Sequence, residues 1–130
     1  MTNTHINVGG HKITIGKQAS LKVATINSSA FNTNESHCYY CVKNGICFVK
    51  GHIVPLSAFT ANTLFASGVP TPWMMSYQQT VGTSTVGTGN RNITITVSGG
   101  VGIINATGGN TASESYFTIA YPVADDWVES

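Results

Sequence analysis

The sequence predicts an all-β fold, an antiparallel β-sandwich or jelly roll. Short runs of aromatic and β-branched residues recur along the chain, and Gly, Asn and Pro separate them, which is the pattern of strands joined by tight turns. No segment longer than a few residues keeps a helical period, the best being the weak run 56–65. Seven or more short strands at regular spacing are typical of sandwiches and jelly rolls.

The composition agrees with a single β-rich domain. The chain has 130 residues and a net charge of +1, and because Arg91 is the only arginine and the lysines are scattered, we expect no nucleic-acid binding. Charged residues make up 8% of the chain, far below the roughly 25% of an average globular protein. Thr, Ser, Asn and Gly take their place beside 42% hydrophobic residues, which argues against disorder. We expect a rigid, oligomeric protein.

The first 35 residues are polar. They contain no apolar run of the kind found in a signal peptide, and no stretch of the chain is apolar for long enough to cross a bilayer. We therefore expect a soluble protein made in a cytoplasm, without membrane insertion. Short alternating pieces flank Gly9-Gly10, which favours a small hairpin. We interpret residues 1–35 as an N-terminal neck or attachment segment, and residues 36–130 as the head domain.

The clearest local signal is the stretch 37–56 (HCYYCVKNGICFVKGHIVPL). Asn44-Gly45 favours the two-residue type I′ turn of a tight hairpin. The turn sets the register, which places Lys43 opposite Ile46 and, four steps further, Tyr39 opposite Lys50. One face then carries Tyr40, Val42, Cys47 and Val49, and the other carries Tyr39, Cys41, Ile46 and Phe48. Because both faces are largely apolar, we expect the hairpin to lie inside a sandwich or a subunit interface.

The cysteines of this hairpin superficially resemble a zinc set, together with His37 and His52. Side chains alternate faces along a strand, so Cys38 and Cys41 point to opposite sides of the sheet. We interpret the three cysteines as reduced structural residues, with metal binding as the alternative, and His52 as a structural histidine. No cofactor or metal is expected.

The rest of the chain divides into further strands and loops. We expect a strand at 63–66, a proline-stiffened loop at 67–72 and a strand with large side chains at 73–79. The Gly, Thr and Ser tract 80–92 is predicted to be a long loop, with at most a weak strand at 83–86.

A second strong hairpin follows this tract. Alternation of Ile and Thr over 93–97 predicts a strand, and Gly99-Gly100 turns it into a partner strand at 101–106. The run 116–123 is predicted to be the last strand.

The order of these elements resembles a known family. An apolar hairpin at 39–54, a strand running into Ser67-Gly68 and a proline-bearing loop, an Ile/Thr hairpin, and a closing strand YFTIAYP are similar to the carboxy-terminal head domain of bacteriophage tail-fibre and receptor-binding proteins. The resemblance covers about residues 36–123 and rests on turns and strand patterns. It implies a jelly-roll head that forms a homotrimer at the tip of a phage tail and binds saccharides of the bacterial surface. This sequence lacks the long shaft of the family, which leaves a fragment, a short tail or baseplate component and a free-standing module as alternatives.

The chain shows no signature of catalysis. Glycoside cleavage usually needs two carboxylates that flank the bond, and G-x-S-x-G, H-E-x-x-H and P-loop motifs are absent. The carboxylates lie in polar loops or in the last six residues: Glu35, Glu114, Asp125, Asp126 and Glu129. We therefore predict a protein that is not an enzyme.

Saccharide binding calls for aromatic rings beside fixed polar groups in loops. Trp73 follows the rigid Pro70-Thr71-Pro72 and could present its ring, although Trp-Met-Met at the start of a strand favours a place in the core. Arg91, beside Asn90 at the end of the expected loop, could hold a phosphate or carboxylate of a teichoic-acid-like polymer, with a solvated charge as the alternative. Near the terminus Asp125 precedes Trp127, whose packing on the core or a neighbouring subunit is the favoured role. The candidate ligand-binding residues are Trp73, Asn90, Arg91, Asp125 and Trp127.

Two functional hypotheses follow. The first is a phage receptor-binding head in the virion, which binds a bacterial cell-surface glycan in clefts between protomers and attaches through its N-terminus to other tail or baseplate proteins. The second is a structural virion or baseplate protein that binds no saccharide. Either would be a heat- or detergent-resistant homotrimer, because closed symmetry covers apolar faces and strand edges. A monomer in light scattering would contradict this expectation.

Overall fold

The computed structural model describes residues 5–8, 11–14, 21–59, 62–73, 78–87, 89–105 and 111–124. Its elements within these ranges are strands. They are β1 (His5–Val8), β2 (His11–Thr14), β3 (Lys22–Val23), β4 (Thr25–Ile26), β5 (His37–Lys43), β6 (Ile46–Ile53), β7 (Thr63–Ser67), β8 (Gln78–Val86), β9 (Gly89–Thr96), β10 (Gly100–Asn105) and β11 (Ser115–Pro122).

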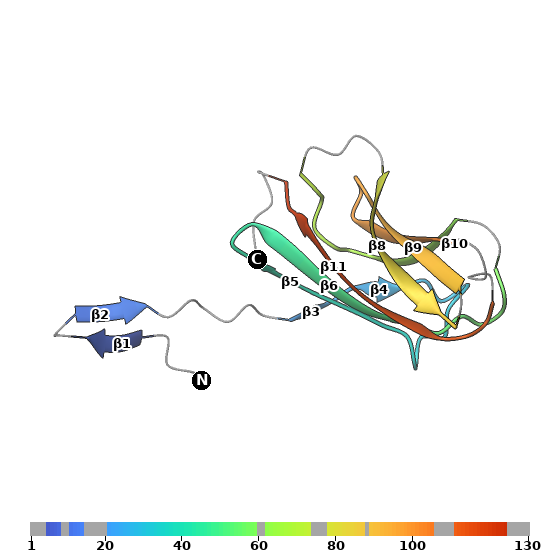
Figure 1. Cartoon of the computed structure of the whole chain (residues 1–130), viewed down its shortest axis with the longest axis horizontal. Coiled ribbons are helices and arrows are strands. Elements are labelled where there is room, and N and C mark those ends of the chain that lie inside the picture. Colours follow the sequence, from blue (N-terminus) through green and yellow to red (C-terminus); the bar gives the residue numbers. More distant parts are fainter. Residues whose placement is uncertain are drawn as a thin grey trace.

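Two antiparallel sheets form a β-sandwich (Figure 1). One has the strand order β4-β7-β10-β9-β8, and the other has the order β11-β6-β5-β3. This confirms the predicted all-β sandwich. The strands β1 and β2 pair antiparallel with each other, with Val8 opposite His11, which is the small hairpin expected around Gly9-Gly10.

The central hairpin has the predicted register, from Lys43 opposite Ile46 to Tyr39 opposite Lys50. Asn44 and Gly45 have φ values of 53° and 77°, as a type I′ turn requires. The face that carries Cys47 and Val49 is buried in the core, whereas Phe48 on the opposite face is 44% exposed. The outer face is therefore only partly covered within one chain.

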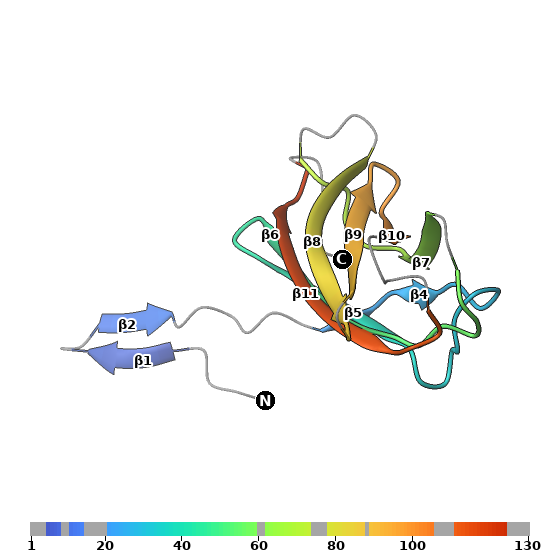
Figure 2. The same cartoon turned by 45° about the vertical axis from the view of Figure 1, so that its right-hand side comes forward.

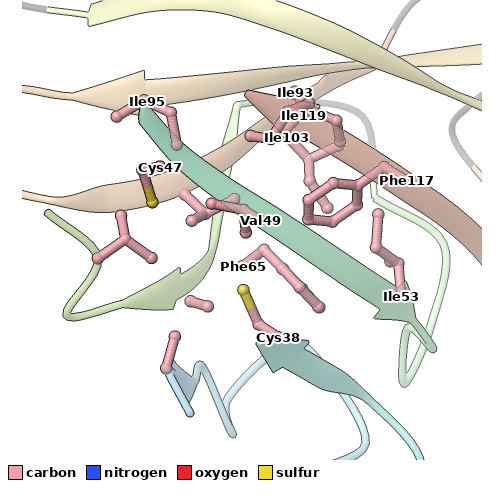
Figure 3. Close-up of a cluster of buried hydrophobic side chains, with 14 of the residues drawn as sticks. Cys38, Cys47, Val49, Ile53, Phe65, Ile93, Ile95, Ile103, Phe117 and Ile119 are labelled. Atoms are coloured by element: carbon pink, nitrogen blue, oxygen red, sulfur yellow. The ribbon is translucent and has the colours of Figure 1, made fainter. Parts of the chain in front are cut away.

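The core lies between the two sheets (Figure 3). Its labelled side chains come from β5, β6, β7, β9, β10 and β11, and they are Cys38, Cys47, Val49, Ile53, Phe65, Ile93, Ile95, Ile103, Phe117 and Ile119. Phe65 stands edge-on to Phe31 and to Phe117, with ring centroids 5.1 Å and 5.9 Å apart. Burying each large apolar side chain contributes about 1.5–3 kcal/mol, so this double-sided packing joins the sheets.

The sandwich begins earlier than the expected boundary at residue 36. Lys22 pairs with Tyr40 in one sheet and Ile26 pairs with Ala66 in the other, so the segment 22–26 passes from sheet to sheet. Phe31 is buried in the core. Residues 22–35 therefore belong to the sandwich and not to the proposed neck. This polar stretch is held by strand pairing and packing with residues far along the chain.

The tract 80–92 is not the long loop that its composition suggested. It forms most of β8 and the start of β9, which pair from Gln78–Thr96 to Val86–Gly89. Threonine is a β-branched residue that suits a strand, and Gly87 supplies the positive φ of 56° at the turn. A bulge lies between Thr80 and Gly82.

The other strand predictions are largely confirmed. The strand at 63–66 corresponds to β7, the Ile/Thr hairpin to β9 and β10, and the closing strand to β11. The strand expected at 73–79 is wrong at its start, because Trp73 lies in a turn and β8 begins at Gln78. Residues 74–77 lie outside the described residues.

Gly51 on β6 offers a test of sheet packing. A Cβ atom at this position would overlap the ring of Phe117 on β11. Gly51→Ala should therefore lower the free energy of unfolding by about 1–3 kcal/mol, the usual cost of overpacking. Urea denaturation measures the loss. In a Phe117→Leu background the same change should cost less, and an equal cost in both backgrounds would contradict the contact.

Candidate functional site

The seam between β8 and β11 is the main candidate site. These are the edge strands of opposite sheets, and they run side by side (Figure 2). The Ser84 hydroxyl donates a hydrogen bond of 2.7 Å to the Tyr116 carbonyl across the seam. Gly82 leaves room for Ile119, whose methyl carbon would lie 2.5 Å from a Cβ atom at residue 82. A small residue therefore lets the two sheets approach closely here.

Two hollows lie along this seam, and we call them together the seam groove. The first has a volume of about 260 Å³ and is lined by Pro72, Trp73, Gln79, Thr80, Val81, Ala120, Tyr121 and Pro122. The second has a volume of about 460 Å³ and is lined by Thr83, Thr85, Glu114, Ser115, Tyr116, Phe117 and Thr118. The lining thus combines exposed threonines with four aromatic residues, of which Trp73 and Tyr116 are exposed.

Trp73 stands at one end of the seam groove. Its side chain is 49% exposed, in contrast to the place in the core that its sequence context favoured. Its backbone N–H donates to the Pro122 carbonyl at 2.9 Å, and Pro72 forms a bridge with Val123. The amide of Ala124 donates to the Thr71 carbonyl at 2.8 Å. The loop is therefore anchored to the end of β11 and holds the Trp73 ring at the surface.

Arg91 is not the exposed ligand-binding residue that we expected. It lies on β9 and is fully buried. Its guanidinium donates to the Ser115 hydroxyl at 2.8 Å and to the carbonyls of Thr111 and Ser113 at 2.8 Å and 2.9 Å. It also lies 5.3 Å from the ring centre of Phe59, and burial lowers its pKa. Arg91 therefore holds the segment that leads into β11.

Of the other candidate residues, Asn90 is not among those that line the seam groove. Asn90 is exposed on β9, opposite Thr85. Asp125 and Trp127 lie outside the described residues. Among the three candidates that the structure describes, which are Trp73, Asn90 and Arg91, Trp73 alone lines the seam groove.

A row of rings that sequence reasoning missed crosses the outer face of the four-stranded sheet. Tyr116 on β11 stacks on His52 on β6, with centroids 4.1 Å apart and planes at 7°. His37 on β5 follows at 6.5 Å, and Tyr39 stacks on His37 at 5.6 Å. We call these four residues the ring row. His52 thus packs in this row, but it is not the fully satisfied structural histidine that we expected. Within the described residues its buried Nε2 atom makes no hydrogen bond and lies 3.7 Å from the Glu114 carboxylate.

The hairpin cysteines lie where strand alternation placed them. Cys38 and Cys47 are buried in the core, and Cys41 is half-buried on the other face. Burial raises the pKa of Cys38 to about 12 and that of Cys47 to about 11, although the Tyr121 hydroxyl lowers the latter. Within the described residues, no group of three His, Cys, Asp or Glu side chains could hold a metal ion.

Comparisons with known proteins do not assign the chain to a family. No family model, no curated protein and no solved structure matches it. In the part of the chain that the structure describes, there is also no helix long and apolar enough to span a membrane.

Replacing Arg91 should test its structural role. Arg91→Met keeps the length of the side chain but leaves the Thr111 and Ser113 carbonyls without their donor, which should cost about 3 kcal/mol of unfolding free energy. Asn90→Ala, at the exposed neighbouring position, should change stability by less than about 0.5 kcal/mol. Urea denaturation compares the two variants. A loss below about 1 kcal/mol in Arg91→Met would contradict this role.

The buried thiols predict a loss of stability at alkaline pH. In the unfolded chain Cys38 and Cys47 release their protons near pH 9, whereas the folded chain retains them to about pH 12 and 11. Because the folded state then binds more protons, the unfolding free energy should fall as pH rises from 9, by up to about 1.4 kcal/mol per pH unit for each thiol. Urea denaturation across this range measures the slope. A Cys38→Ala, Cys47→Ala variant with an unchanged slope would contradict the assignment.

Proposed function

We propose that the protein binds a bacterial cell-surface glycan, as the head of a phage tail-fibre or receptor-binding protein. The seam groove is the observation that carries the proposal. It combines a half-exposed tryptophan on an anchored loop with a line of threonine hydroxyls, between the edges of two packed sheets.

This combination suits a saccharide chain. A sugar has apolar C–H faces that pack on aromatic rings, and hydroxyls that need fixed polar partners. Trp73 and the 61% exposed Tyr116 offer rings at the two hollows. Thr80, Thr83 and Thr85 offer hydroxyls that can both donate and accept hydrogen bonds. The hollows follow one another along β8 and β11, which suits an extended polymer better than a compact ligand.

The phage setting also stays a prediction, and its support is the resemblance of the sequence pattern of strands and turns to that of tail-fibre heads. The homotrimer, the virion location and the attachment through the N-terminus stay predictions. Binding without catalysis also stays a prediction. It is supported by the seam groove as described, whose lining includes Glu114 but no second carboxylate, since glycoside cleavage usually needs a pair.

A second candidate function is a structural virion or baseplate protein that binds no saccharide. The exposed apolar side chains on the sheet β11-β6-β5-β3 favour it. Val23 is 72% exposed, pairs with Tyr39 at the edge of this sheet, and lies on the face of Phe48. Such side chains suit contact with another subunit. The two candidates differ in whether the wild-type protein binds any glycan.

The Trp73→Ala variant should distinguish glycan binding from a purely structural role. We expect it to weaken glycan binding about tenfold, equivalent to 1.4 kcal/mol. Because the side chain is half exposed, the unfolding free energy should change much less than for a core residue. A bacterial glycan array followed by isothermal titration calorimetry measures the change.

Leu56→Ala serves as the control, because it removes another exposed apolar side chain, 58% exposed and outside the seam groove. It should bind as the wild type does. Absence of binding by the wild-type protein would favour the structural role, and equal binding by Trp73→Ala would reject the groove.

A further inference from the structure

The ring row borders a small hollow on the outer face of the sheet β11-β6-β5-β3. The hollow has a volume of about 150 Å³ and is lined by His37, Tyr39, Lys50, Gly51, His52 and Tyr116. Pockets that enclose drug-sized ligands measure about 300–1,000 Å³. This one is therefore the size for a single ring of a larger ligand, and we call it the ring pocket.

The ring pocket adjoins the seam groove at Tyr116. Tyr116 lines both, with the threonines of β8 on one side and the rings of β5 and β6 on the other. Its ring is stacked at 4.1 Å on His52, which fixes its plane. A polymer in the seam groove could therefore place one further unit over Tyr116 and into the ring pocket.

The charge of the ring pocket differs from that of the seam groove. Lys50 lies at its wall, paired in register with Tyr39 and Thr118. Within the described residues no ion pair joins Lys50 to a carboxylate, and the one carboxylate near the ring pocket, Glu114, lies 3.7 Å from the Nε2 atom of His52. Beside apolar ring faces, a lysine that has no counter-ion among the described residues is suited to pair with an anionic group.

We propose that the ring pocket binds an acidic sugar unit, one that carries a carboxylate or phosphate, of the glycan in the seam groove. This inference rests on the proposed function. The sugar ring packs on Tyr116 and Tyr39, and the anionic group pairs with Lys50. Lys50, which lies outside the seam groove, therefore gives the protein its preference for acidic glycans.

The test uses pairs of glycans that differ in charge alone. Oligogalacturonate and its methyl ester test the carboxylate, and phosphomannan and its dephosphorylated form test the phosphate. We expect the wild-type protein to bind the charged member of at least one pair about tenfold more tightly, and Lys50→Gln to remove this difference. Tyr116→Phe should retain binding and Tyr116→Ala should lose it.

Lys43→Gln is the matched control, because it removes the same charge from the exposed turn end of β5, outside the ring pocket. It should retain the preference for the charged glycan. Equal binding of both members of each pair, or equal effects of Lys43→Gln and Lys50→Gln, would overturn the inference. Binding to neutral array glycans alone would overturn it and leave the proposed function intact, whereas no binding to any glycan would overturn both.

Discussion

The type I′ turn at Asn44-Gly45 sets the register on which the sandwich depends. It places Cys38, Cys47 and Val49 on the inner face of β5 and β6, where they join the core. A slip by one residue would turn these side chains to the solvent. The same register places His37 opposite His52, so one turn organises both the hydrophobic core and the three members of the ring row that lie on β5 and β6. The buried face makes this register costly to change.

Closure of the sandwich at β8 and β11 depends on small residues and on one buried cation. Gly51 leaves space for Phe117, and Gly82 leaves space for Ile119, so that β11 can pack against both neighbours. Arg91 then fixes the segment before β11 through its bonds to Thr111, Ser113 and Ser115. The seam groove is therefore shaped by buried contacts directly beneath it, while its exposed threonines are free to vary without loss of packing.

The local elements of this fold could be predicted from the sequence, and its long-range contacts could not. The turn at Asn44-Gly45 and the alternation around Ile93 carry their own signals, and both hairpins form as predicted. Nothing local shows that β11 pairs with β6, so the stack of Tyr116 on His52 was missed, although the hairpin register alone pairs His52 with His37. Arg91 was misplaced for the same reason, because its carbonyl partners lie 20 residues and more away in the chain.

The low charge of the chain affects the desolvation cost of binding a glycan in the seam groove. Apart from Glu114, the lining of the seam groove as described is uncharged. Hydroxyls can exchange hydrogen bonds with water for hydrogen bonds with a sugar at little desolvation cost, whereas charged groups would lose solvation on binding. Affinity for a neutral polymer then comes mainly from the rings of Trp73 and Tyr116. Lys50 is the one lysine or arginine among the residues that line the ring pocket as described. Its charge is therefore the main attraction for an anionic group there. A single lysine can therefore decide which glycans bind, while the seam groove supplies affinity common to all of them.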